Sequence, residues 1–192
     1  MRKLMRVTLA VAGIVGYMLL ASPGTSAQKL PKSITIQAQA MGQSTQLGRT
    51  FNVTLIIQEF STPDDQKALL AAFNEKKNEG LVNALSKMHT KGRMSITGTL
   101  GYDVSYIRQW KQPNGSIKYR LVTNRPITFG EAWSDSRSMD YSLSGVEIIM
   151  YPDKKKNSGT LLPAVKLKIN KEGQLELETF QNPWKLVNIM RR

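Results

Sequence analysis

Apolar and polar residues alternate with a period of two soon after residue 33. Apolar side chains occupy every second position from Ile34 to Ala40, which is the pattern of a half-buried strand. The segment FNVTLIIQEF repeats this pattern, with apolar side chains at every second position from Val53 to Ile57. A polar loop, GQSTQLGRT, separates the two segments. The pattern therefore predicts an opening β-hairpin.

The period changes to that of a helix after residue 61. Thr62 stands where an N-cap is expected, Pro63 suits the first helical position, and Asp64 and Asp65 suit the positive end of the helix dipole. A second apolar stripe, in LVNALSKM, follows the polar stretch NEKKNEG. We predict two helices, or one helix kinked near Gly80, on one face of a sheet.

Strand patterns return at RMSITGTL and continue to the C-terminus. YDVSYIRQW and IKYRLV flank KQPNGS, whose Pro, Asn and Gly suit a chain reversal. A loop of even length would place Trp110 opposite Tyr119 and Tyr106 opposite Thr123. This register predicts an aromatic-rich face across the two strands.

A further hairpin joins LPAVKLKI to QLELETF through NKEG. A three-residue loop over 171–173 would place glycine at the left-handed position. The resulting register pairs Lys168 with Glu176, Lys166 with Glu178, and Leu167 with Leu177. Opposite charges then share one face and aliphatic side chains the other. VEIIMY reads as another strand, and NPWKLVNIM as a final strand or a docked terminal segment.

These elements predict an α+β fold. We expect a mostly antiparallel sheet of seven or eight strands, forming a sandwich or a partly open barrel, with a helical hairpin or kinked helix inserted after the second strand. The 192 residues, of which 41% are hydrophobic and 21% charged, suit one globular domain.

The first 27 residues have the composition of a signal peptide. MRKLMR is basic, VTLAVAGIVGYMLLA is apolar, and TSA before Gln28 offers small residues for cleavage. The apolar run is shorter than the roughly 20 residues of a spanning helix, although an uncleaved membrane anchor is the alternative. We therefore predict residues 1–27 as a signal peptide and 28–192 as a single exported domain, periplasmic or extracellular, with no transmembrane span after signal removal.

The charge of the chain is strongly basic. The net charge is +13, and without the three basic residues of the signal 24 basic residues oppose 14 acidic ones. Such a chain favours anionic partners in the cell envelope, although scattered lysines also simply maintain solubility. Two basic clusters stand out, Lys154–Lys156 and the group Lys87, Lys91 and Arg93 near His89. Nucleic acid is not expected, because these groups are not interleaved with aromatic rings.

Several chemistries are excluded by residues that the chain lacks. Without cysteine there is no thiol nucleophile, disulfide, thiolate zinc site or iron–sulfur cluster. His89 is the only histidine and no GxSxG is present, which argues against a serine hydrolase triad. GxGxxG and Walker patterns are also absent. We expect no cofactor and no metal site.

The segment RPITFGEAWSDSRSMDY, 125–141, concentrates two arginines, three carboxylates and a tryptophan: Arg125, Glu131, Trp133, Asp135, Arg137 and Asp140. One interpretation makes Glu131 with Asp135 or Asp140 an acid/base pair, with an arginine holding an anionic substrate. The other has the arginines bridging the carboxylates and fastening two parts of the sheet. We favour the second interpretation, because a charge-balanced segment in a basic chain suits an internal network.

The chain also resembles a family of small exported bacterial proteins of uncharacterised function. VTNRPITFGEAW, SMDYSLSGVEI, NPWKLVNI and the helical segments DDQKALLAAF and GLVNALSKM carry the resemblance, which covers most of the mature chain. It implies a single exported domain, and no activity, ligand or catalytic residue comes with it.

The first functional hypothesis is a non-enzymatic binding or accessory module of the cell envelope that holds an anionic or amphipathic partner. The binding residues expected from the sequence are Arg125, Trp133, Arg137, Trp110 and Tyr119, and Trp184 is a further apolar contact. The alternative is a carboxylate-dependent hydrolase that uses Glu131 with Asp135 or Asp140.

Overall fold

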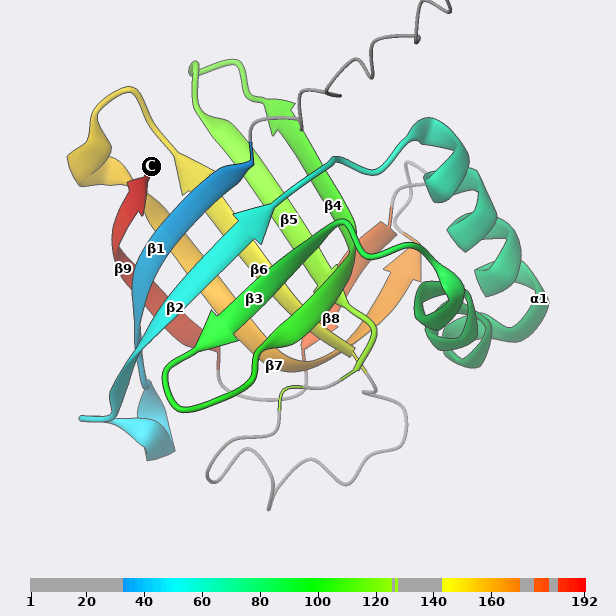
Figure 1. Ribbon diagram of the computed structural model, residues 1–192, viewed down its shortest axis with the longest axis horizontal. Coiled ribbons are helices and arrows are strands. Elements are labelled where there is room, and N and C mark those ends of the chain that lie inside the picture. Colours follow the sequence, from blue (N-terminus) through cyan, green and yellow to red (C-terminus); the bar gives the residue numbers. More distant parts are fainter. Residues whose placement is uncertain (1–32, 126, 128–142, 170–174, 180–182) are drawn as a thin grey trace, which may run out of the picture. The chain divides into compact units, whose positions relative to one another are not determined.

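The computed structural model describes residues 33–125, 127, 143–169, 175–179 and 183–192, all within the compact unit Pro31–Arg192. These residues form nine strands, one α-helix and two short 3₁₀ helices (Figure 1). In chain order the elements are β1 (Ile34–Met41), η1 (Ser44–Gln46), β2 (Thr50–Ile57), α1 (Pro63–Lys87), β3 (Gly92–Ile96), β4 (Tyr102–Lys111), β5 (Ile117–Thr123), β6 (Leu143–Met150), η2 (Lys154–Lys156), β7 (Ser158–Ile169), β8 (Leu175–Thr179) and β9 (Trp184–Arg191).

Eight of the strands close into an antiparallel barrel. Strands β1 to β7 follow one another around the ring, β9 pairs with β7, and β9 pairs back to β1 (Figure 1). The start of β7 pairs with both β6 and β9, and its last five residues pair with β8, which stands outside the closed ring. The prediction of a mostly antiparallel, sheet-rich α+β fold is confirmed. The sheet is a closed barrel, however, and neither a sandwich nor a partly open barrel.

Alternating side chains of the barrel strands fill its interior. Ile36, Leu55, Ile107 and Ile148 are among the fully buried residues of this core. An eight-stranded barrel is just wide enough for its own side chains to fill. The opening hairpin predicted from the sequence forms two adjacent strands of the barrel, β1 and β2. They pair in an antiparallel register that places Ile34 opposite Ile57. Period-two alternation therefore becomes an inner apolar face and an outer polar face.

The start of α1 is as predicted. The Thr62 hydroxyl accepts a hydrogen bond from the Asp65 N–H (3.1 Å), and the Asp65 carboxylate accepts one from the Thr62 N–H (2.7 Å). This reciprocal pair satisfies two backbone donors that a helix start leaves without partners.

The predicted kink near Gly80 is present and lies at Lys76 and Lys77, whose backbone is non-helical. Gly80 is where the two halves of α1 touch: a Cβ there would lie 2.1 Å from the Ala72 carbonyl oxygen. The glycine therefore marks the contact between the halves, and the bend precedes it.

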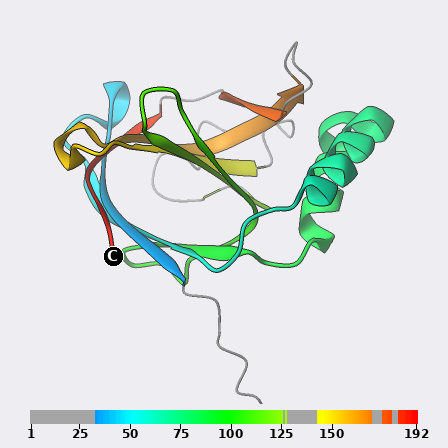
Figure 2. The same cartoon turned by 90° about the horizontal axis from the view of Figure 1, so that it is seen from above.

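A second apolar cluster joins α1 to the outer wall of the barrel. Leu69, Leu81 and Leu85 are fully buried against outward-facing residues that include Tyr106 and Val122. Figures 1 and 2 both place α1 beside the barrel wall. The protein thus has two apolar layers, one inside the barrel and one between its wall and the helix.

The β7–β8 register is confirmed. The structure pairs Lys168 with Glu176, Lys166 with Glu178, and Leu167 with Leu177. The predicted loop, 171–173, lies outside the described residues. Alternating charged and aliphatic residues in both strands fix this register, because a shift by one residue would exchange the two faces.

The predicted β4–β5 register is wrong by one residue. Trp110 lies opposite Lys118, Tyr119 lies opposite Gln109, and Tyr106 lies opposite Val122. Residues 112–116 connect the paired Lys111 and Ile117, so the loop has an odd number of residues. A one-residue change in loop length moves one strand's side chains to the other face. Trp110 and Tyr119 therefore lie on opposite faces of the sheet.

Lys91, predicted to belong to a basic surface cluster, is buried instead. Its side chain is 7% exposed, and its Nζ lies 2.8 Å from Glu59 Oε1 and 3.2 Å from Asp65 Oδ2. This ion-pair network joins the segment before β3 to Glu59, between β2 and α1, and to Asp65 in the first turn of α1. Lys91 thus fastens the helix to the barrel and is not available to a partner.

Candidate functional site

Most of the segment 125–141 lies outside the described residues. This applies to Glu131, Trp133, Asp135, Arg137 and Asp140, so both interpretations of the segment stay predictions. Arg125 is described and exposed. Its guanidinium lies 5.2 Å from the centroid of the Tyr102 ring, and its Nη2 donates to the Gly101 carbonyl oxygen (3.3 Å).

Buried hydroxyls fasten the start of this segment to the barrel. The Ser144 hydroxyl accepts from the Ile127 N–H (2.5 Å) and donates to the Pro163 carbonyl (2.6 Å). The Thr123 hydroxyl accepts from the Ser144 N–H (3.0 Å) and donates to the Arg125 carbonyl (2.5 Å). The described start of the segment is therefore held by the hydroxyls of Thr123 and Ser144, which no sequence pattern indicated.

Three of the predicted aromatic contacts, Trp110, Tyr119 and Trp184, lie among the described residues and do not form one site. Tyr119 is fully buried inside the barrel, whereas Trp110 is partly exposed on its outer face. Trp184 is buried in the core, with its ring 4.7 Å from that of Phe51. Arg125 follows the end of β5, the strand that begins two residues before Tyr119. These described residues thus occupy separate places in the fold.

A charged cluster surrounds Trp110 on the outer wall. The cationic groups of Arg108, Lys118 and Arg120 lie 6.0, 5.9 and 5.3 Å from its ring centroid. Glu147 pairs with Lys118 at 3.0 Å and with Arg120 at 2.6 Å. The ion-paired side chains are largely buried, at 12% to 27% exposed. The cluster therefore stabilises the outer wall of β4, β5 and β6 through internal contacts.

An open hollow lies at one end of the barrel. It has a volume of about 770 Å³ and lies where the start of β1, the β4–β5 turn, the end of β6, η2 and the end of β9 meet (Figure 1). We call this hollow the barrel mouth. Its apolar wall is formed by Ile34, Ile117, Tyr119, Met150 and Pro152.

Tyr119 closes the base of the barrel mouth. Its ring stacks on Phe60 at 6.4 Å between centroids, and its hydroxyl accepts a hydrogen bond from Arg191 Nη1 (3.3 Å). Because Tyr119 is 0% exposed and packed core residues lie beneath it, the mouth does not continue into the barrel. A ligand would occupy the end of the barrel and not its interior.

Four exposed cations line the barrel mouth and the hollow next to it: Lys154, Lys155, Arg191 and Arg192. We call them the basic rim. None of the four forms an ion pair with a carboxylate of another described residue. The adjoining hollow, of about 650 Å³, shares Met150, Lys154, Arg191 and Arg192 with the mouth. The rim therefore presents positive charge directly beside an apolar surface.

Asn157 positions the lysines beside the arginines. Its amide Nδ2 donates to the Ile189 carbonyl (3.1 Å) in β9, and its Oδ1 accepts from the Tyr151 N–H (2.9 Å). The Asp153 carboxylate accepts from the Lys155 N–H (3.1 Å) and caps η2. These contacts hold the turn that carries Lys154 and Lys155 against the last strand, which ends in Arg191.

The sequence revealed only part of this site. The cluster Lys154–Lys156 was noticed, whereas Arg191 and Arg192 were not. The two groups meet because β9 pairs with β1 and β7, and no local pattern predicts that closure. The one sequence signal for the rest of the site is the pair of cations, Arg191 and Arg192, at the end of the last apolar strand.

The remaining observations do not add another site. Within the described ranges, no three His, Asp or Glu side chains converge as metal ligands. In the part of the chain that the structure describes, no helix is long and apolar enough to span a membrane. No family model, curated protein or solved structure matches the chain. The barrel mouth with its basic rim is therefore the candidate site.

Proposed function

We propose that this protein is an exported, non-enzymatic binding module of the cell envelope that holds an anionic amphiphile, a lipid with a negatively charged headgroup, at the barrel mouth. The observation that carries this proposal is the contact between an apolar wall and a basic rim at one open end of the barrel. An anionic amphiphile has a matching pair of parts, an apolar chain beside a negatively charged headgroup.

The apolar wall suits hydrocarbon chains. Ile34, Ile117 and Met150 are only partly buried although they pack against the core. Covering such side chains with hydrocarbon stabilises a complex by about 25 cal/mol for each Å² of apolar surface removed from water. The volume of about 770 Å³ also falls within the range of small-molecule pockets, roughly 300–1,000 Å³.

The basic rim suits a phosphate or another anionic headgroup. Lys154, Lys155 and Arg192 are exposed, and none of them forms an ion pair with a carboxylate of another described residue. Hydrogen bonds between charged partners are shorter and stronger than those between neutral ones. The excess of basic over acidic residues along the chain also attracts anionic ligands over distance. Both effects weaken with salt.

Export is part of this proposal and is supported by the predicted signal peptide at residues 1–27. The hydrolase alternative depends on Glu131, Asp135 and Asp140, which lie outside the described residues. Several described carboxylates are already engaged by cations, as Glu147 is by Lys118. We therefore favour binding over catalysis.

The test is calorimetric titration of the mature protein with two short-chain lipids below their micelle-forming concentrations. Dioctanoyl phosphatidylmethanol carries one negative charge, and dioctanoyl phosphatidylcholine has the same chains with no net charge. We expect the anionic lipid to bind, and the zwitterionic lipid to bind at least tenfold more weakly. A loss of that order corresponds to about one charge-assisted hydrogen bond.

Matched variants locate the site. The double variant Lys154→Gln/Lys155→Gln removes two rim charges and should weaken binding of the anionic lipid about tenfold or more. Lys76→Gln/Lys87→Gln removes two exposed charges on α1 and should leave it nearly unchanged. Equal losses in the two variants would show that net charge, and not the basic rim, drives binding. No binding of either lipid would overturn the proposal.

A further inference from the structure

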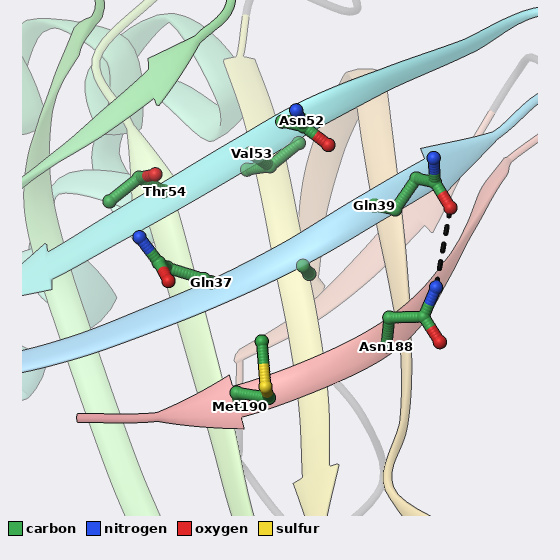
Figure 3. Close-up of a pocket in the computed structure, with 8 residues that line it drawn as sticks. Gln37, Gln39, Asn52, Val53, Thr54, Asn188 and Met190 are labelled. Carbon is green, nitrogen blue, oxygen red and sulfur yellow. Dashed lines mark hydrogen bonds between the residues drawn. The ribbon is translucent and has the colours of Figure 1, made fainter.

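We infer that the barrel mouth adjoins a hydroxyl-binding groove, and that the headgroup of the bound amphiphile is a polyol, such as a sugar or an inositol ring, linked through phosphate. This inference rests on the proposed function, because it extends the same binding surface. The groove is a hollow of about 420 Å³ on the outer face of β1, β2 and β9 (Figure 3). Its polar lining consists of Gln37, Gln39, Asn52, Thr54 and Asn188.

Strand register assembles these side chains. Gln37 lies opposite Thr54, and Gln39 lies opposite Asn52, so four polar groups form an array on neighbouring strands. Asn188 approaches the array from β9 on the other side of β1, and its Nδ2 donates to Gln39 Oε1 at 3.3 Å (Figure 3).

The other members of the array are free to bind a ligand. The side chains of Gln37, Asn52 and Thr54 make no hydrogen bond to any other described residue. Such groups on a barrel wall are normally satisfied by water. Here they line a hollow, where a ligand with hydroxyl groups can replace that water.

The chemistry of the groove favours hydroxyl groups over additional anions. Each Gln or Asn amide offers both donors and an acceptor, and a threonine hydroxyl does the same. A polyol presents neighbouring hydroxyls that also donate and accept. Among the described residues, no charged side chain lines this hollow, although the chain as a whole is strongly basic. The groove is therefore matched to a neutral, hydroxyl-rich group.

An unusual backbone conformation places Asn188 at the groove. The pairing of β1 with β9 shifts register between Gln37 and Gln39, and Asn188 has a φ of 53°. A bulge of this kind inserts an extra residue and redirects a side chain, and bulges are frequent beside functional sites. Asparagine tolerates the left-handed conformation better than most residues. The bulge brings the Asn188 amide to the groove.

The groove and the mouth are linked through the hollow beside η2. Asn188 and Met190 line both the groove and the hollow beside η2, and that hollow shares Lys154 and Arg191 with the mouth. An apolar surface, a cationic surface and a hydroxyl-binding surface thus follow one another in that order. A lipid whose phosphate links acyl chains to a polyol has the same order.

The test compares dioctanoyl phosphatidylinositol with dioctanoyl phosphatidylmethanol by calorimetric titration of the mature protein. Both lipids carry the same chains and one negative charge, and they differ in the inositol ring. We expect the inositol lipid to bind about threefold to tenfold more tightly, as one or two additional neutral hydrogen bonds would provide.

Variants of the groove should remove the preference for the inositol lipid over phosphatidylmethanol. Asn188→Gly deletes the amide, and glycine adopts a φ of 53° readily, so the fold should be retained. Ser44→Gly, at a second residue with positive φ outside the groove, is the matched control and should keep the preference. Thr54→Val is a second groove variant of nearly the same shape.

Each outcome bears separately on the two proposals. Equal affinities for the two lipids, or a preference that survives in both groove variants, would overturn the polyol inference and leave the anionic-amphiphile proposal intact. Binding of glycerophosphoinositol, which lacks acyl chains, as tightly as the inositol lipid would overturn the lipid proposal and uphold the groove. Failure of all three probes to bind would overturn both.

Discussion

Replacement of Lys91 by methionine should strongly destabilise the fold. Methionine has nearly the same length but lacks the ammonium group that lies 2.8 Å from Glu59 and 3.2 Å from Asp65. The variant would leave two carboxylates near each other with no cation between them. The link between the start of α1 and the barrel would then be replaced by repulsion.

The size of the effect follows from burial. Removing one partner of a buried ion pair costs about 3–5 kcal/mol. The side chains of Glu59 and Asp65 are 47% and 22% exposed, so water can partly solvate them after the change. We therefore expect a loss of about 2–3 kcal/mol in the free energy of unfolding, at or below the lower end of that range. At about 2–4 °C per kcal/mol, Tm should fall by roughly 5–10 °C.

The same network sets a pH dependence. Burial alone would lower the pKa of Lys91, but hydrogen bonds to Glu59 and Asp65 outweigh it and raise that pKa. Its stabilisation is therefore complete below the ordinary pKa of 10.5 and is lost as pH rises through the raised value. Burial alone would raise the pKa of Asp65, but the Thr62 N–H and Lys91 lower it. That contribution is present above the ordinary pKa of 3.8 and is lost as pH falls through the lowered value.

Urea unfolding followed by circular dichroism, at pH 7 and across the alkaline range, measures these effects. Lys87→Met, at an exposed lysine of α1, is the control and should change the unfolding free energy by no more than about 0.5 kcal/mol. Above pH 10.5 the stability of Lys91→Met should decrease less than that of the unchanged protein, because the contribution of Lys91 is absent. A Lys91→Met variant as stable as the Lys87→Met variant would refute the assigned role of the network.

Two further predictions concern packing and buried hydroxyls. Gly80→Ala should lower the free energy of unfolding by about 1–3 kcal/mol in urea titrations, because its Cβ would overlap the Ala72 carbonyl. A gain in stability, as the helix propensity of alanine alone would give, would contradict the contact between the halves of α1. Ser144→Ala should cost about 1–3 kcal/mol, because it leaves buried backbone partners unsatisfied. Ser105→Ala should be nearly neutral, since the buried Ser105 hydroxyl has no hydrogen-bond partner in the described structure. Equal losses in the two serine variants would contradict the role given to Ser144.

The sequence predicted the elements whose causes are local. The start of α1 depends on Thr62, Pro63 and Asp65, which lie within four residues of one another. The β7–β8 register depends on alternating charged and aliphatic residues, which specify one pairing. The predicted β4–β5 register is wrong because the residues of KQPNGS indicate a turn but do not fix whether the loop has an odd or an even number of residues.

Closure of the barrel could not be predicted from local patterns. It depends on the pairing of Gln37 with Met190 and of Val146 with Leu161, and the first pair joins the two ends of the described chain. The candidate site depends on the same closure, because Lys154 and Arg191 lie on separate elements. The segment 125–141, which the sequence marks by its charge density, lies almost wholly outside the described residues.

Methyl NMR during titration with dioctanoyl phosphatidylmethanol tests the proposed binding site most directly. With isoleucine and methionine methyl groups labelled, the account predicts saturable shifts at Ile34, Ile117 and Met150, which line the barrel mouth. Met41, exposed at the opposite end of β1, should not shift. Saturable shifts elsewhere, with the methyl groups of the mouth unchanged, would contradict the assignment of the mouth as the lipid-binding site.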